Sequence, residues 1–216
     1  LRLTSAALAK VRTAAADAPY DDDDAELPWL MNARARALMG LGRWSLAAEQ
    51  LAAARRDPES GRPNVSQAIN LAILYCRLGR PKDGLDAISD VERVSPYGRM
   101  QLETVRLLAA LATSDAEEAT RALDFLRDHQ ADSPQTYQAG LVHADQLDEA
   151  SRLLISRLED PVLRTDALMA VQEYADSPAT PLSSRWERRW RAVLARPEVK
   201  AAIAKVGRAE RFPIVD

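Results

Sequence analysis

Apolar residues recur at helical spacing along most of the chain, and in two places the pattern repeats itself. Segments 37–58 and 72–96 each hold an apolar-periodic stretch, then Leu-Gly-Arg, then a second periodic stretch rich in small residues, then proline. Gly42 and Gly79 lie 37 residues apart (79 − 42). Because glycine accepts the left-handed backbone conformation at which helices end, both glycines predict a turn between two helices.

Proline follows the second helix of each predicted pair. We expect Pro58 and Pro96 to end those helices, because proline lacks an N–H group and clashes with the preceding turn. A helix–turn–helix unit repeated at this period is typical of stacked helical pairs, in which small residues allow close helix contacts. The pattern therefore predicts an all-α fold, an α-α superhelix of stacked helix-turn-helix repeats. We prefer it to an irregular bundle whose small-residue pattern only reflects abundant alanine.

At these residues the chain resembles the tetratricopeptide repeat family, whose unit of about 34 residues alternates large, small and aromatic positions before a proline. The segment from Val65 supplies these positions with Leu71, Ala72, Tyr75, Gly84, Ile88 and Pro96, and more weakly with Ala68 and Val91. The segment from Pro28 supplies Met31, Ala35, Leu38, Ala47, Leu51 and Ala54, while Arg34 breaks the pattern.

Weaker copies of the unit flank these two. One covers 114–134, where Ser114 and Glu117 predict a capping box at the start of a helix, and another ends with 145–161. At the front, Ala7, Val11, Ala14 and Pro19 match only the second half of a unit, so we expect the chain to begin in mid-repeat, as a piece of a longer protein. The sequence predicts repeats over residues 1–161.

After residue 161 the period is lost, and we expect residues 162–216 to form a C-terminal helical capping region that covers the open end of the array. We predict one helix from Asp160 to about Ala175, and another whose capping box is Ser184 with Glu187. A last helix is expected from Pro197 to Gly207. This ending resembles the tails of repeat modules in bacterial regulators.

The charge distribution changes this picture little. Net charge is −3 for 216 residues, with an acidic run at 21–26 and a basic end at 183–211 that holds nine Lys or Arg against three Glu. No apolar run approaches the roughly 18 residues of a membrane span, so we expect no membrane span within this chain. Cys76 is the single cysteine, which excludes an internal disulfide and leaves the compartment open between cytoplasm and periplasm.

Residues that carry chemistry are sparse. The chain has no phosphate-binding glycine loop and no His or Cys pair at zinc spacing. His129 and His143 stand alone at predicted helix ends, Cys76 lies inside a predicted helix, and the run 21–24 lacks the glycine and distal glutamate of a calcium loop. We therefore expect no enzyme, no cofactor and no metal site.

The most concentrated cluster is the segment 185–191, with sequence RWERRWR. Trp186 and Trp190 are four residues apart and share a helix face, and the basic patch around them consists of Arg185, Arg188, Arg189 and Arg191. A nucleic-acid site would use the indoles for stacking, whereas a capping helix would bury both to seal the last repeat. We favour the cap, because the rest of the chain is acidic and repels a polyanion.

The resemblance implies a concave groove that binds a protein or peptide partner, lined by the first helix of each pair. It assigns to this groove Trp29, Asn32, Arg36, Ser66, Asn70, Ile73 and Arg77, and from the weaker units Gln101, Thr104, Gln135 and His143. Some family members bind a C-terminal carboxylate with asparagine and basic residues at set positions. Asn70 matches one of them, but Arg36 and Val105 do not fit the others.

The sequence thus predicts a non-catalytic protein–protein interaction scaffold. One alternative is a regulatory or sensor module of a longer bacterial protein with an upstream DNA-binding or catalytic domain. A second is nucleic-acid binding through the basic end. The sequence leaves the oligomeric state open.

Overall fold

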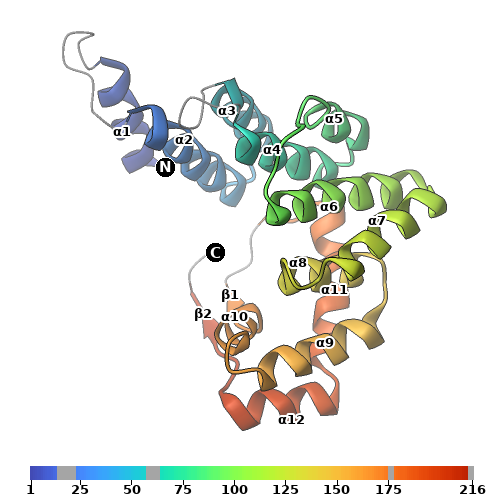
Figure 1. Cartoon of the computed structure of the whole chain (residues 1–216). Helices are drawn as coiled ribbons and strands as arrows, with labels where there is room; N and C mark the ends of the chain where they lie inside the picture. Colours follow the sequence, from blue (N-terminus) through green and yellow to red (C-terminus); the bar gives the residue numbers. More distant parts are fainter. Residues whose placement is uncertain (14–22, 57–63, 175–177, 214–216) are drawn as a thin grey trace.

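The computed structural model is mostly helical, in agreement with the predicted all-α class (Figure 1). It describes residues 1–13, 23–56, 64–174 and 178–213. The helices are α1 (Arg2–Thr13), α2 (Asp23–Gly40), α3 (Trp44–Arg56), α4 (Val65–Arg77), α5 (Pro81–Asp86), α6 (Pro96–Thr113), α7 (Ala116–Asp128), α8 (Pro134–His143), α9 (Leu147–Glu159), α10 (Arg164–Ala170), α11 (Pro181–Leu194) and α12 (Pro197–Val206). Two short strands, β1 (Glu173–Tyr174) and β2 (Arg211–Phe212), pair in parallel.

Consecutive helices form contacting pairs: α2 with α3, α4 with α5, α6 with α7, and α8 with α9. Gly42 and Gly79 adopt the predicted left-handed conformation, with φ of +68° and +73°. In the third and fourth pairs Ser114 and Asp145 take the same conformation without being glycine, with φ of +59° and +65°. This substitution explains why the sequence signal for those two turns is weak, since side chains adopt left-handed geometry only at a cost.

The predicted role of Pro96 is wrong. Pro96 does not end the second helix of its pair, because α5 already ends at Asp86 and passes into turns. Pro96 instead occupies the first turn of α6, as Pro134 does in α8. The first turn of a helix needs no N–H from its residues, so proline is favoured there. Pro58 lies outside the described residues.

Two predicted helix starts are displaced. Ser114 ends α6, and Asp115 caps α7 instead by accepting a hydrogen bond from the Glu118 N–H at 3.1 Å. The helix that Ser184 was expected to cap is capped four residues earlier, by a reciprocal capping box between Thr180 and Ser183. In both helices the side-chain oxygen of the residue just before the helix accepts a hydrogen bond from one of the free helix N–H groups.

The remaining C-terminal expectations are met in part. The helix predicted from Asp160 begins at Arg164 and ends at Ala170, because Asp160 accepts the Val162 N–H (2.7 Å) in a separate turn. The prediction that this helix reaches about Ala175 is wrong, because the chain leaves the helix after Ala170 and forms β1 at Glu173–Tyr174. The last helix runs from Pro197 and ends before Gly207, as predicted.

The core consists of two large apolar clusters that meet at α6. One side of α6, including Leu102 and Val105, packs with α2–α5, and the other side, including Met100 and Leu107, packs with helices α7–α12. Figure 1 shows the corresponding arrangement, with α1–α5 on one side of α6 and α8–α12 on the other. Gly84 lies at a helix contact, since an added Cβ there would stand 2.8 Å from the Cys76 Sγ.

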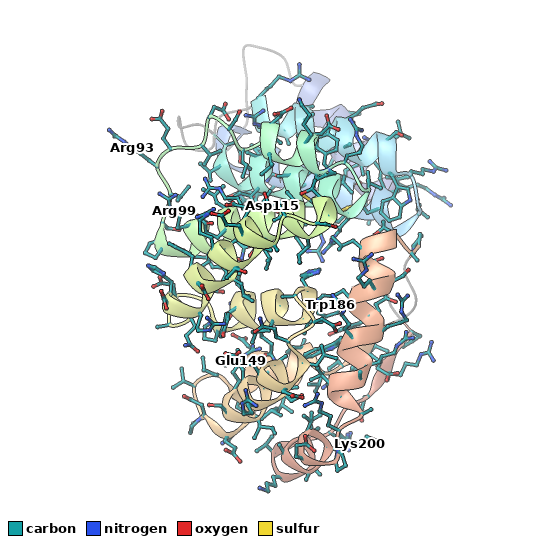
Figure 2. All side chains as sticks on the ribbon, turned by 90° about the vertical axis from the view of Figure 1, so that its right-hand side faces the viewer. Arg93, Arg99, Asp115, Glu149, Trp186 and Lys200 are labelled. Carbon is teal, nitrogen blue, oxygen red and sulfur yellow. The ribbon has the colours of Figure 1, made fainter. Side chains whose placement is uncertain are left out.

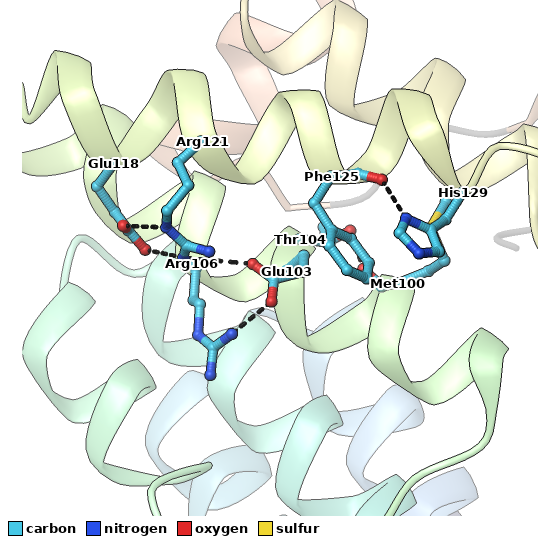
Figure 3. Close-up of polar contacts among 8 residues, drawn as sticks. All are labelled: Met100, Glu103, Thr104, Arg106, Glu118, Arg121, Phe125 and His129. Atoms are coloured by element: carbon cyan, nitrogen blue, oxygen red, sulfur yellow. Dashed lines mark hydrogen bonds and ion pairs between the residues drawn. The ribbon is translucent and has the colours of Figure 1, made fainter.

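An ion network joins α6 to α7 (Figure 3). The Glu103 side chain is only 3% exposed and pairs with both Arg106 and Arg121. Arg121 also binds Glu118 through two nitrogens, at 2.7 and 2.5 Å, and this hydrogen bonding lowers the pKa of Glu118. At the other end of the hairpin His129 stacks on Phe125 and donates to its carbonyl oxygen at 3.0 Å. We call Glu103, Arg106, Glu118 and Arg121 the hairpin network.

None of the helices over the described ranges combines the length and the apolar character that crossing a membrane requires.

Candidate functional site

A cavity of about 950 Å³ opens along the inner side of helices α2, α4, α6 and α8. The segment 178–187, which includes the first turns of α11, forms part of its wall. Ligand sites in proteins usually measure about 300–1,000 Å³. The cavity is therefore large enough for several residues of a peptide.

The two ends of the cavity differ in composition. Towards the N-terminal ends of α2, α4 and α6 the cavity is lined by Trp29, Ser66 and Tyr97, and we call these residues the mouth. Trp29 and Tyr97 are large aromatic side chains left 44% and 52% exposed. Exposed aromatic residues beside a cavity are typical of interaction sites, because they give up much apolar surface on contact.

Near the C-terminal ends of α4 and α8 the cavity is lined by Arg77, His143 and Trp186, and we call these residues the inner end. Here α11, which carries Trp186 (Figure 2), contacts both α4 and α8. The Trp186 and His143 rings lie 6.3 Å apart. Leu182, one turn before Trp186, also faces the cavity. The beginning of α11 therefore covers the inner end, while its distal part packs on the C-terminal core.

Arg189 fixes α11 to α8. Its guanidinium donates to the His143 carbonyl oxygen at 2.5 Å and pairs with Asp145 at 2.9 Å. The last carbonyl groups of a helix lack partners within the helix, so a cation at this place satisfies them and the negative helix end. Arg189 therefore serves the fold rather than an external ligand.

The cavity is electropositive although the whole chain is acidic. Its charged lining residues are three arginines, Arg36, Arg77 and Arg93, and one carboxylate, Glu187. Within the part of the chain that the structure describes, Arg77 makes no ion pair or side-chain hydrogen bond. The Arg77 side chain is exposed, and although partial desolvation lowers its pKa, arginine remains charged at any physiological pH.

His143 is neutral at physiological pH. Burial lowers its pKa to about 3, and the charges of Arg77 and Arg189 lower it further in the same direction. The neighbouring Trp186 indole nitrogen is buried and has no acceptor among the described residues. The inner end thus contains donors but no described acceptor that neutralises Arg77.

Amide side chains form part of the wall between the two ends. Asn70 donates to the Asn32 side-chain oxygen at 3.3 Å, which links α4 to α2. Gln101 donates to the Thr136 hydroxyl at 2.8 Å, which links α6 to α8. These amides are therefore already engaged with each other or with neighbouring helices.

Most of the predicted groove residues come together at this cavity. Nine of the eleven line it, namely Trp29, Asn32, Arg36, Ser66, Asn70, Ile73, Arg77, Gln101 and His143. Thr104 is buried and donates to the Met100 carbonyl at 2.9 Å, because α8 packs against this part of α6. Gln135 is exposed in the first turn of α8, outside the lining. The two residues outside the cavity both belong to the weaker units.

The sequence did not indicate the part of the wall that α11 supplies, which consists of Thr180, Leu182, Ser183, Trp186 and Glu187. The Thr-Pro pair at 180–181 could have marked the start of this helix. The position of α11 against α4 and α8 depends on contacts between residues distant in sequence, so no local sequence pattern predicts it.

The basic patch is divided between fold and surface. Arg185, Arg188 and Arg191 are exposed, whereas Arg189 is engaged with α8. Trp186 and Trp190 stack on each other with ring centroids 5.6 Å apart and pack against the C-terminal core. A capping role was expected to bury both tryptophans, but each is only half-buried. Trp186 keeps part of its surface exposed because it also borders the cavity.

Neither a family model, nor a curated protein, nor a solved structure matches this chain. Within the described ranges, no three His, Cys, Asp or Glu side chains gather in a way that could hold a metal ion. Cys76 is buried, and burial raises the pKa of its thiol to about 11, so the reactive thiolate is suppressed.

Proposed function

We propose that this chain is a non-catalytic interaction scaffold, a TPR-like array of helical pairs that binds a peptide segment of a partner protein in the cavity. The observation that supports this most is the cavity itself. Side chains from four helices, far apart in the sequence, converge on one space of about 950 Å³ with exposed aromatic residues at its mouth.

The lining suits a peptide. Trp29 and Tyr97 offer large apolar surfaces, and tryptophan and tyrosine are enriched among the residues that dominate binding energy. Ile73 and Leu182 provide apolar walls further inside. Peptide backbone groups need hydrogen-bond partners when they leave water, and the hydroxyl of Ser66 near the mouth can supply one.

The basic patch gives less support to nucleic-acid binding. Arg189 is already engaged with α8 and Asp145, and the two indoles stack on each other against the core. Stacking of bases on aromatic rings requires accessible ring faces.

The experiment that tests the scaffold role is selection of peptides from a phage-displayed library on the immobilised protein, followed by affinity measurements on variants. Trp29→Ala and Tyr97→Ala should each weaken binding of the selected peptides about tenfold, the cost of losing an aromatic contact. Because both side chains are exposed, unfolding free energy should change by no more than about 0.5 kcal/mol.

Leu85→Ala and Met169→Ala provide matched controls, since these exposed apolar residues lie outside the cavity lining. They should leave affinity unchanged. Selected peptides that bind the two mouth variants as tightly as the wild type, or that lose affinity through the controls, would place the binding surface elsewhere.

A further inference from the structure

We infer that the inner end of the cavity binds the carboxylate of an acidic side chain, glutamate or aspartate, of the peptide partner, and that Arg77 is the residue that pairs with it. This inference rests on the proposed function and specifies the chemistry of its ligand.

The first reason is the missing counter-ion of Arg77. Its side chain is exposed in the cavity wall, so an anion that enters the cavity can reach the guanidinium group and pair with it. The one carboxylate among the described lining residues, Glu187, lies beyond ion-pair distance from Arg77. The negative end of the α4 helix compensates the charge only in part.

The second reason is geometry. The guanidinium group is a planar fork of N–H donors that matches the two oxygens of a carboxylate. Beside it, neutral His143 keeps one ring N–H donor, and His143 in this state adds no positive charge of its own. The inner end therefore offers more than one donor to a single anionic group.

The third reason favours a side chain over a backbone terminus. An inserted backbone would bring carbonyl groups that need donors, but the side-chain N–H groups of Asn70 and Gln101 already donate to Asn32 and Thr136. The methylene stem of a glutamate needs no such partner. It can pack on the apolar side chains of Ile73 and Leu182, which line the same cavity.

The experiment uses pools of peptides that are acetylated and amidated at their ends, so that no terminal carboxylate is present. Three pools carry Glu, Gln or Lys at a fixed central position and are otherwise random. Fluorescence of the protein reports binding, because Trp186 belongs to the inner end. The wild type should bind the Glu pool about tenfold more tightly than the Gln pool, the effect of one charge-assisted contact.

Variants then assign the effect to one residue. Arg77→Gln should abolish the preference for Glu, and Arg77→Glu should turn it into a preference for Lys. Such an inversion cannot result from a folding defect. Arg152→Gln changes the net charge by the same amount on the exposed surface of α9, and it should retain the preference of the wild type.

Two results would overturn the inference and leave the scaffold role intact: equal binding of the Glu and Gln pools, or a preference for Glu that persists in Arg77→Gln. Tighter binding of an uncapped Gln pool than of the capped Glu pool would show that the inner end binds the terminal carboxylate of a peptide and not an acidic side chain. If none of the pools binds, capped or uncapped, the proposed function falls together with the inference.

Discussion

The hairpin network and the inner end of the cavity both use arginine, but they differ in what faces the charge. In the hairpin network Glu103 is almost fully buried, and Arg106 and Arg121 lie on either side of it. At the inner end Arg77 has no described partner, and its side chain is exposed in the cavity wall. In the hairpin network, cations and a carboxylate from the same chain pair with each other and hold two helices together. At the inner end the chain supplies the cation alone, so Arg77 remains available to an anionic ligand.

The strongest test of this difference removes the cations of the hairpin network. The double variant Arg106→Ala, Arg121→Ala leaves the Glu103 carboxylate buried without a partner. Breaking a buried ion pair from one side costs about 3–5 kcal/mol, so urea denaturation should show a loss of this size. A loss below about 1 kcal/mol would mean that the network contributes little to the fold.

The second largest effect is expected at the stacked indoles of α11. Removing a fully buried tryptophan costs about 3–5 kcal/mol, and for the half-buried Trp190 we expect about half, roughly 2 kcal/mol, for Trp190→Ala. Thermal unfolding measures the change. An unaltered midpoint would indicate that α11 does not pack firmly on the C-terminal core.

How far the sequence predicts this structure depends on whether the decisive contacts are local. The turns at Gly42 and Gly79 are local, and their prediction is confirmed. The role of Pro96 does not follow from local sequence alone, because a proline between two helices can either end the first or begin the second. The early end of α5 shows that Pro96 begins α6. The place of Arg77 on the cavity wall followed from the repeat pattern, but its lack of a partner depends on residues distant in sequence.

The C-terminal region shows the same limit. Its apolar pattern indicates helices, and the bounds of α12 follow from Pro197 and Gly207. Nothing in the segment 178–187 indicates that it lies across the ends of α4 and α8. The pairing of β1 with β2 could not be predicted either, because strands of two residues are too short to show a periodic pattern of apolar residues.

The third effect concerns pH at the inner end and is small over any single pH unit. His143 has a pKa of about 3 in the folded protein against an ordinary value of 6.5, so the unfolded chain binds the proton more readily between these values. Stability should therefore fall as pH decreases from 6.5 towards 3, by at most about 1.4 kcal/mol per pH unit. Denaturation curves of wild type and His143→Gln should diverge in this range. Parallel pH profiles would contradict the burial of a neutral histidine beside two arginines.

The smallest effect is expected for Arg77 itself. Because it has no described partner to lose, Arg77→Gln should change the free energy of unfolding by no more than about 0.5 kcal/mol. This value stands in direct contrast to the loss expected in the hairpin network. A loss above about 2 kcal/mol in urea would show that Arg77 supports the fold and is not held free for a ligand.

The most direct test of the central claim is amide hydrogen–deuterium exchange of the protein with and without a capped peptide that carries a central glutamate and is chosen from the pools. If the cavity is the binding site, the bound peptide should slow exchange in α4 and in the segment 178–187, which line it. Slower exchange on the Arg152 face of α9 or in α7, with no change in α4, would contradict the account.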